Sequence, residues 1–519
     1  MKTNLLLTIL LFSAISNGQT FTRKYPVTQD TQPYTLGSCA PIIQTADGGH
    51  ILNYSYGYPG IHGGPLYSEI IKTDAAFLPL WKKEIGGSNG IKTLGFSDGS
   101  SIFFENSFSF YLFSFSLEKF DSNGQTLWRK SDFAVDPYKI SIQDALVKNT
   151  NTIKLAGIQE YNSGSSGYNS QPVLMDFDTN GNYIQGISLS IPSVPYGGIE
   201  SMCQETSGDY YVVIKNLASR YVAKFSASNA IIWCKKLNLN NGDFYTITTS
   251  VALNNGDLLI GGNYNNYSVG FLTFALVRIT TDGNLVWSKT INDLRTSISS
   301  FKELSANEIM ATGTISPDFI PRSVIMKIDG NGNPVWAKKY SNAFSISELY
   351  PKSSNDWYYA AFSYSITEIS SPFIFNTQND GMATCNAEDV SFNFIDNPTS
   401  LSTVSLTTNP LTLLTPTTIT TGQSVTQIYE DDCIPLLSNS NIIKINDCKI
   451  FPNPSNGEVN VLSNGIMHKI TVNTILGQRV KEFYPNGTES NFIIQSNGIY
   501  LITIETEIGI QRFKIIIAN

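Results

Sequence analysis

Short apolar runs, bounded by glycine, asparagine, serine and aspartate, follow one another along most of this chain of 519 residues. The stretch "SDGSSIFFENS" places a turn before an apolar run, and "NNGDLLIGGNY" repeats that arrangement further along. Such β-branched and aromatic runs between turn-forming residues are typical of strands, whereas few stretches carry apolar residues at helical spacing. The pattern predicts an all-β protein, and the length predicts at least two domains.

One phrase recurs with a period near fifty residues. Its clearest copies are "KFDSNGQTLW", "RITTDGNLVW" and "KIDGNGNPVW", and its last residue falls on seven anchor positions that lie 47 to 57 residues apart. The anchor positions are Trp81, Trp128, Gln185, Trp233, Trp287, Trp336 and Cys385. A second phrase, a turn followed by an apolar strand, interleaves with the first and also occurs seven times. Two hairpins in each period make the four strands of a propeller blade.

The repeats therefore predict a seven-bladed β-propeller over residues 19–395. Each blade is expected to run from strand a through a tight turn to strand b, a variable loop, strand c, an Asp/Asn–Gly turn and strand d with the anchor. The segment "FTRKY" at 21–25 is similar to "WAKKY" at 336–340. We expect it to add an outer strand to the last blade and so to close the ring.

Five of the six tryptophans occupy the anchor position: Trp81, Trp128, Trp233, Trp287 and Trp336. The phrase resembles the tryptophan-docking motif of quinoprotein-like propellers, and this local resemblance implies that each indole stacks on the neighbouring blade. A buried indole contributes a large apolar area and one donor that needs an acceptor, which fits a packing role. Stacking on a cofactor is the alternative. The adjacent cysteine pair of many quinoprotein dehydrogenases is missing, and we expect no cofactor.

The phrase "DGNGN" also resembles a calcium-binding loop, because Asp329, Asn331 and Asn333 offer oxygen ligands. The later bidentate glutamate of such a loop is absent, and the sister copies read "DSNGQ" and "TTDGN". A glycine at a left-handed position of a hairpin turn explains the pattern more simply. We expect no metal.

The opening segment "MKTNLLLTILLFSAISNGQT" combines a lysine, an apolar core and small residues, which is the pattern of a secretory signal peptide over residues 1–18. Its apolar run is too short for a transmembrane anchor, and no later segment is long and apolar enough to cross a membrane. The net charge is −8 and no Lys/Arg cluster occurs, which argues against a nucleic-acid partner. The six cysteines lack C-x-x-C spacing and leave many disulfide pairings open, of which Cys385 with Cys433 is one.

Catalytic signals are weak. Only three histidines occur, His50, His62 and His468, and no G-x-S-x-G elbow accompanies them. Most acidic residues fall in turns, where capping of the backbone explains them. A carboxylate pair for sugar hydrolysis in the propeller funnel stays open as an alternative.

The connections between strands b and c suggest a binding face. Several are long and rich in tyrosine, asparagine and glycine, as in "YGYPGIHGGPLY" and "EYNSGSSGYNSQP". Their candidate binding residues, for stacking on sugar rings or for contact with a protein, are Tyr58, His62, Tyr161, Tyr168, Tyr264 and Tyr267. The alternative is that these are ordinary solvated loops.

The chain changes character near residue 396. Residues 396–445 are rich in Thr, Ser and Pro and predict an extended or β-rich connector. Residues 446–519 alternate apolar and polar positions between Gly/Asn turns, which predicts a small antiparallel β-sandwich.

This last unit closely resembles the type A C-terminal sorting domain of the Bacteroidetes type IX secretion system. The resemblance rests on "FPNPSNG", "ILGQRV", "GIYLI" and the basic-then-apolar ending "RFKIII". The residues that carry it are Pro452, Asn453, Pro454, Gly457, Gly477, Gly498, Tyr500 and Lys514. It implies that the type IX machinery is a partner and that the protein is secreted or held on the outer surface of a Gram-negative cell. A carbohydrate-binding sandwich is the alternative.

We therefore expect a propeller cargo that binds a glycan or an extracellular protein without catalysis. An extracellular polysaccharide-active enzyme and a passive surface-coat protein are the alternatives.

Overall fold

The computed structural model contains strands, turns and no helix in the residues it describes. None of these residues therefore forms a helix that could span a membrane. The structure describes residues 22–24, 35–39, 42–45, 47–57, 66–86, 88–108, 113–131, 133, 138–162, 168–192, 197–216, 219–239, 242–291, 295–305, 308–316, 322–340, 343–351, 356–363, 372–378, 387–413, 417–418, 423–425, 430–433, 448–474, 478–506 and 509–518. The expected signal peptide lies outside them.

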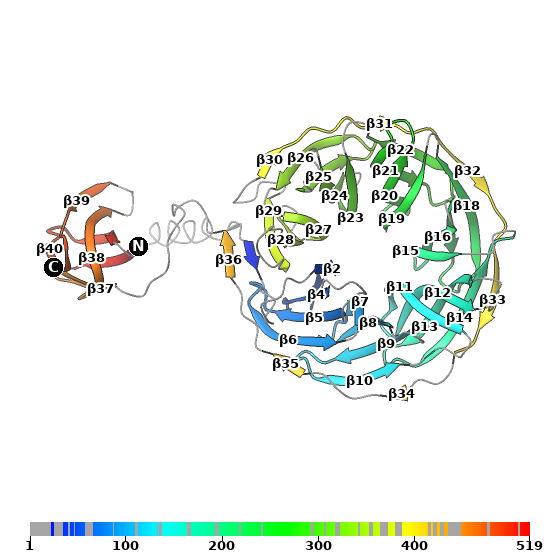
Figure 1. The fold of residues 1–519 in the computed structure, drawn as a ribbon, viewed down its shortest axis with the longest axis horizontal. Helices are drawn as coiled ribbons and strands as arrows, with labels where there is room; N and C mark the ends of the chain where they lie inside the picture. The colour runs from blue at the N-terminus through cyan, green and yellow to red at the C-terminus, as the bar shows by residue number, and fades with distance from the viewer. Residues whose placement is uncertain are drawn as a thin grey trace, which may run out of the picture. The chain divides into compact units, whose positions relative to one another are not determined.

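The chain divides into two compact units, residues 1–435 and 436–519. The first unit contains seven antiparallel sheets arranged around a central axis, so the predicted seven-bladed propeller is confirmed (Figure 1). Blade 1 contains β2 (Thr35–Cys39), β3 (Ile43–Gln44), β4 (His50–Gly57), β5 (Leu66–Thr73) and β6 (Pro79–Gly86). Blade 2 contains β7 (Ser88–Gly95), β8 (Ser101–Phe108), β9 (Phe113–Phe120) and β10 (Thr126–Ser131). Blade 3 contains β11 (Tyr138–Asn149), β12 (Thr152–Asn162), β13 (Tyr168–Asp178) and β14 (Tyr183–Ser190).

The remaining blades follow the same order from the axis outward. Blade 4 contains β15 (Gly198–Gln204), β16 (Tyr210–Asn216), β17 (Ser219–Phe225) and β18 (Ile231–Leu239). Blade 5 contains β19 (Gly242–Ala252), β20 (Leu258–Asn266), β21 (Phe271–Ile279) and β22 (Leu285–Thr290). Blade 6 contains β23 (Thr296–Ser305), β24 (Glu308–Ile315), β25 (Arg322–Asp329) and β26 (Pro334–Tyr340). Blade 7 contains β27 (Ala343–Pro351), β28 (Asp356–Ser363), β29 (Pro372–Gln378) and the N-terminal β1 (Thr22–Lys24).

The predicted ring closure is confirmed, because β1 pairs antiparallel with β29 and places Thr22 opposite Phe375. The apolar cores lie between consecutive blades. Between blades 5 and 6, for example, Phe274 and Leu276 pack with Ile298 and Met326, each at most 1% exposed. Burying one such side chain stabilises the fold by roughly 1.5–3 kcal/mol.

The c–d turns of blades 1, 2, 3 and 6 are capped by their own aspartates, and a serine or threonine takes that place in blades 4 and 5. In blade 6 the Oδ1 atom of Asp329 accepts the backbone N–H groups of Asn331 at 2.9 Å and Asn333 at 2.8 Å. Gly332 completes the turn with a φ of +78°, a conformation that glycine adopts without steric cost. The Oδ1 atom of Asp329 therefore accepts hydrogen bonds from the backbone of the turn.

Each such turn also receives the tryptophan of the preceding blade. The indole Nε1 of Trp287 donates to the carbonyl of Gly330 at 2.8 Å, and its ring lies so close to Gly332 that a Cβ there would be 3.0 Å from it. Trp233 donates in the same way to Thr281 of blade 5 at 2.9 Å. The indoles thus fill the inter-blade space and lie against glycine.

The same contact joins the early blades. The Nε1 atom of Trp81 donates to the carbonyl of Ser122 at 3.1 Å, and a Cβ at Gly124 would lie 2.7 Å from its ring. The ring of Trp128 covers Gly181 at the same distance, but its Nε1 atom has no hydrogen-bond acceptor among the described residues. The turn that follows Trp336 lies outside the described residues.

Where a blade does not follow a tryptophan anchor, the residue in its c–d turn also differs. The residue four positions before the anchor is glycine in every blade that follows a tryptophan. It is Asn229, with a φ of +69°, in the blade after Gln185. It is Phe77, with a φ of +60°, in blade 1, which follows blade 7, where β1 and not the segment of Cys385 forms the fourth strand. A side chain is accommodated at this left-handed position only where no indole occupies the space above it.

The Thr/Ser/Pro-rich stretch runs around the outside of the propeller. Its strands add one outermost strand to every blade, in the order 6, 5, 4, 3, 2, 1, 7, which is the reverse of the order in which blades 1–6 are built (Figure 1, yellow to orange). These strands are β30 (Ala387–Asp389), β31 (Ile395–Asp396), β32 (Thr399–Thr403), β33 (Thr407–Leu411), β34 (Thr417–Thr418), β35 (Gln423–Val425) and β36 (Glu430–Cys433). We call residues 387–433 the belt.

Few large side chains hold the belt. Phe392 is 8% exposed and packs edge-on against Phe274, and Leu411 is 9% exposed. Lys289 and Lys338 form ion pairs of 2.7 Å with belt aspartates. Cys385 lies outside the described residues, so its pairing with Cys433 stays a prediction. The free thiols among the described cysteines are Cys203, Cys234 and Cys448.

The second unit is the predicted small antiparallel sandwich. Its strands are β37 (Cys448–Phe451), β38 (Glu458–Thr474), β39 (Arg479–Phe483), β40 (Gly487–Ile493), β41 (Gly498–Thr506) and β42 (Gly509–Ile517). The long β38 pairs through its first half with β37 and β40 and through its second half with β39 and β41. Alternate residues of β38, such as Val459, Val461 and Met467, therefore face one apolar core.

Candidate binding surface

The b–c loops and the d–a connections emerge at one end of the ring, which we call the loop face. In blade 5, Gly242 at the start of β19 pairs with Asn266 at the end of β20, so both connections meet there. The short a–b and c–d turns occupy the other end. The loop face therefore carries most of the variable surface of the propeller.

The predicted binding residues have different positions. Tyr58 and His62 lie outside the described residues. Tyr161 pairs with Asn169 and Tyr168 with Asn162, so their backbones meet at the loop end of the β12–β13 hairpin. The structure describes the backbone of these two tyrosines only.

The two blade-5 tyrosines separate. Tyr264 is 1% exposed and packs with Phe244 in the core between blades 4 and 5, at a ring-centroid distance of 6.5 Å. Tyr264 was expected on the surface because the repeat does not reveal which face of β20 a residue occupies. Its burial excludes it as a ligand-binding residue. Tyr267 is 68% exposed just beyond the end of β20, and the nearby Asp243 carboxylate raises the pKa of its hydroxyl.

A groove of about 300 Å³ opens between blades 5 and 6, and its lining includes Gly270, which follows Tyr267 in the β20–β21 loop. Most of its lining groups are hydroxyls, amides and backbone, with one guanidinium and one aliphatic side chain. The lining residues are Asn263, Gly270, Leu272, Arg295, Thr296, Ser297, Thr314 and Ser316. Leu272 is 39% exposed and offers an apolar contact at the rim.

Two polar atoms of the groove lack a partner among the residues that the structure describes. They are the Oδ1 atom of Asn263 and the Oγ1 atom of Thr296, both buried from solvent. The neighbouring hydroxyls of Ser297 and Thr314 bond to each other at 2.6 Å. An unpaired buried polar atom costs free energy, so a ligand hydroxyl that reaches either atom after a small rotation of its side chain would gain by bonding to it. The sequence repeat had no signal for these groove residues, because they come from three separate strands.

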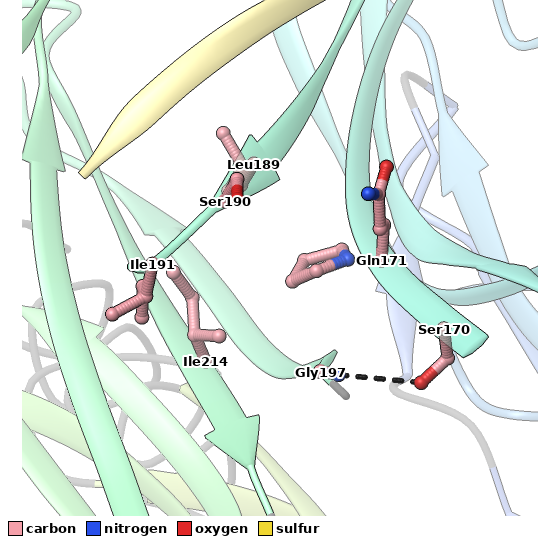
Figure 2. Close-up of a pocket in the computed structure, with 8 residues that line it drawn as sticks. Ser170, Gln171, Leu189, Ser190, Ile191, Gly197 and Ile214 are labelled. Atoms are coloured by element: carbon pink, nitrogen blue, oxygen red, sulfur yellow. Dashed lines mark hydrogen bonds between the residues drawn. The ribbon is translucent and has the colours of Figure 1, made fainter. Parts of the chain in front are cut away.

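A smaller pocket of about 90 Å³ lies between blades 3 and 4 on the same face. Figure 2 shows Ile191 and Ile214 on one side of it, with Ser170 and Gln171 on the other. The backbone N–H of Gly197 donates to the Oγ atom of Ser170 at 3.2 Å and closes one edge. This volume holds a few waters or one small group, so it is a subsite at most.

The carboxyl groups with a raised pKa lie away from these pockets. Burial raises the pKa of Glu69 to about 7 and raises that of Glu118. Each is 1% exposed or less and forms an ion pair, Glu69 with Lys82 at 2.6 Å and Glu118 with Lys83 at 3.6 Å. A substrate cannot reach either of them.

In the second unit the sorting motif holds the last strand. The side chain of Asn453 donates from Nδ2 to the carbonyl of Lys514 at 2.8 Å and accepts the N–H of Ile516 at 3.0 Å. Tyr500 donates its hydroxyl to the carbonyl of Ser496 at 2.9 Å. Gly457 and Gly498 have φ values of +112° and +156°, and Gly477 lies outside the described residues. The motif therefore fixes β42 against the sandwich.

Comparison with known proteins identifies this second unit. Residues 449–518 match the family described as "Secretion system C-terminal sorting domain". A search of curated protein sequences found no match to the chain.

Several solved structures have a similar arrangement at low identity. A protein of unknown function from Dyadobacter fermentans is 9% identical with a TM-score of 0.42, over 69% of this chain and 98% of that one. The polysaccharide lyase Uly1 is 11% identical with a TM-score of 0.39, over 70% of this chain and 93% of that one. PorZ of Porphyromonas gingivalis, an essential surface component of the type-IX secretion system, is 8% identical with a TM-score of 0.29, over 93% and 75%. Likenesses this distant carry no argument about function.

The sorting-domain match and the geometry of its motif agree. Residues 449–518 are a C-terminal sorting domain of the type IX secretion system, which directs the chain to the cell surface or the extracellular space.

Proposed function

We propose that this protein is a binding protein whose loop face takes a carbohydrate in the groove between blades 5 and 6. The observation that carries the proposal is the pair of buried, unsatisfied polar atoms of Asn263 and Thr296 in a groove lined by hydroxyls and amides. Sugars present several hydroxyl groups, each of which donates and accepts, and they also have an apolar ring face. The exposed ring of Tyr267 and the rim side chain of Leu272 would contact that apolar face.

A polysaccharide-active enzyme is the second candidate. General acid catalysis on a glycosidic bond needs a carboxyl group with a raised pKa that touches the substrate. The carboxyl groups of that kind among the described residues are Glu69 and Glu118. Glu69 is buried in an ion pair within blade 1, and Glu118 in one between blades 1 and 2. Binding without cleavage therefore has the better support.

The test is a glycan array with the full chain, followed by calorimetry on any glycan that binds. Each sample is also analysed by mass spectrometry for new oligosaccharides. Asn263→Ala and Tyr267→Ala should each weaken binding about tenfold, because a lost hydrogen bond or ring contact is worth about 1–1.5 kcal/mol. Tyr484→Ala is the matched control, since Tyr484 is 64% exposed and lies in the sorting domain.

Three outcomes would contradict the proposal. Unchanged binding by both groove variants would place the site elsewhere. New oligosaccharides would favour the enzyme. Absence of binding across the array would favour a surface-coat role.

A further inference from the structure

The interface between blades 3 and 4 departs from the pattern of the other interfaces. In blades 1, 2, 4, 5 and 6 a basic residue stands in strand c two positions before the turn, opposite an apolar or aromatic residue of strand b. These register pairs are Lys72 with Ile51, Lys119 with Ile102, Lys224 with Tyr211, Arg278 with Leu259 and Lys327 with Met310. In blade 3 the strand c residue is Asp176, and its strand b partner is Lys154.

Two further differences coincide at this interface. The anchor of blade 3 is Gln185 in place of tryptophan, and the next turn carries Asn229 in place of glycine. The side chain of Asn229 therefore reaches the space that an indole fills in other blades. There it meets the buried pair of Lys154 and Asp176.

The four groups that meet there are arranged for a reaction. The Lys154 Nζ atom lies 2.8 Å from the Asn229 Oδ1 atom and 2.5 Å from the Asp176 Oδ1 atom. The other carboxylate oxygen of Asp176 lies 3.4 Å from the Asn229 Nδ2 atom. The Tyr210 hydroxyl donates to the Asn229 Oδ1 atom at 2.8 Å. The side chain of Asp176 thus bridges an amine and an amide nitrogen, while Tyr210 polarises the amide carbonyl.

Burial brings the neutral form of the Lys154 amine within reach near pH 8. Lys154, Asp176 and Tyr210 are each 1% exposed, and the Lys154 Nζ atom lies 4.6 Å from the Tyr210 ring centroid. Burial lowers the pKa of Lys154 to about 8. Burial alone would raise the pKa of Asp176, but Lys154, Gln185 and Lys148 hold it below its ordinary value, so its carboxylate is ionised and, at 2.5 Å from the Lys154 Nζ atom, can take up a proton from that nitrogen only transiently. A desolvated lysine with a lowered pKa is a nucleophile.

We propose that Lys154 and Asn229 form an intramolecular isopeptide bond that joins blade 3 to blade 4. Asp176 takes a proton from the Lys154 ammonium, and the amine lone pair attacks the Asn229 Cγ atom after a small rotation of the amide. Tyr210 stabilises the oxygen of the tetrahedral intermediate. The Cγ–Nδ2 bond then breaks as Asp176 returns its proton to the departing nitrogen, and the attacking nitrogen gives its second proton to the released ammonia, which leaves as an ammonium ion.

The reaction balances without an oxidant or a co-reactant. One C–N bond forms and one breaks, and a lysine ammonium and a primary amide become a secondary amide and an ammonium ion. The product chain is about 17 Da lighter than the unlinked chain, the mass of one ammonia. A covalent bond takes the place of the docked indole at the one described interface where glutamine replaces tryptophan.

The test is a tryptic peptide map of the folded full chain after incubation near pH 8. Trypsin does not cleave after a lysine whose amine is in an amide, so residues 149–215 should appear joined to residues 225–235, about 17 Da below the sum of the two peptides. The peptide map is insensitive to processing at either terminus. Peptides 149–154 and 225–235 found only in unlinked form would overturn the proposal.

Variants and an internal control separate the chemistry from mere proximity. Asn229→Gly restores the residue that other turns have, so it should fold and give no linked peptide. Asp176→Asn should leave the peptides unlinked, because the base is lost. Lys130 donates to Asn182 at 2.6 Å, but Asn182 is exposed, so this pair should stay unlinked in the same digest. Linkage in Asp176→Asn, or at Lys130, would contradict the assigned roles.

Discussion

Replacing Gly124 by alanine tests how one blade docks on the next. Gly124 has a φ of +78°, and a Cβ added there would lie 2.7 Å from the ring of Trp81. The substitution therefore adds two costs, a left-handed backbone for a residue with a side chain and an overlap with an indole. Gly256 separates them, because it has a φ of +85° in an a–b turn and its added Cβ would meet its nearest atom at 3.5 Å.

The expected magnitudes differ accordingly. Alanine in the left-handed region costs about 1–2 kcal/mol, which applies to both positions. Overpacking against the partly buried ring of Trp81 costs about 1–3 kcal/mol, which applies only to Gly124. Gly124→Ala should thus lower the free energy of unfolding by about 2 kcal/mol more than Gly256→Ala does.

Urea unfolding followed by tryptophan fluorescence measures this difference. All six tryptophans precede residue 358, so the signal reports the propeller and not the sorting domain. A double-mutant cycle with Trp81→Ala provides the decisive comparison, since removal of the ring should remove the overlap and leave only the backbone cost. Equal losses for Gly124→Ala and Gly256→Ala, or an unchanged loss in the Trp81→Ala background, would refute the docking argument.

Three other predictions follow from buried groups. Burial lowers the pKa of His50 from 6.5 to about 4, so between these pH values the unfolded chain binds a proton that the folded chain does not. This contribution to stability is complete above pH 6.5 and is lost as the pH falls. By pH 5 the wild type should lose about 2 kcal/mol more of its unfolding free energy than a His50→Phe variant, as measured by urea unfolding. Burial raises the pKa of the Cys234 thiol to about 12, so an aromatic disulfide reagent at pH 8 should label it only after urea is added, and labelling in the folded state would contradict this. Phe392→Ala and Leu411→Ala should each lower the unfolding free energy by about 2 kcal/mol and make the belt sensitive to limited proteolysis. Proteolysis at the wild-type rate would show that other contacts hold the belt.

The period of the sequence was sufficient to predict the propeller, because each blade repeats its own turn and strand pattern. The strand from 21–25 was also predictable, since "FTRKY" copies an outer strand. The belt was not. Its strands are two to five residues long and rich in threonine and serine, and their register is set by the blade edges they join rather than by their own pattern.

The candidate site was only partly accessible to sequence reasoning. A tyrosine in a loop-proximal strand looks the same whether it faces a core or solvent, which is why Tyr264 and Tyr267 were grouped together. The groove residues Asn263 and Thr296 are unremarkable in sequence, and only the fold brings them together. The position four residues before each anchor could have predicted which blades receive an indole. It is glycine in the blades that follow a tryptophan anchor, and Phe77 and Asn229 occupy it in the other two.

The belt gives the propeller a mechanical order. The chain leaves the ring at β36, which pairs with β1 so that Thr22 lies opposite Cys433. Tension applied through the C-terminal unit therefore loads the β36–β1 pair first and reaches β35 and β34 only after that pair has separated. The belt strands would thus separate from the blades one after another, beginning at β36. Blade 7, which contains β1, is therefore loaded first, and each other blade is loaded only after the preceding belt strand has separated.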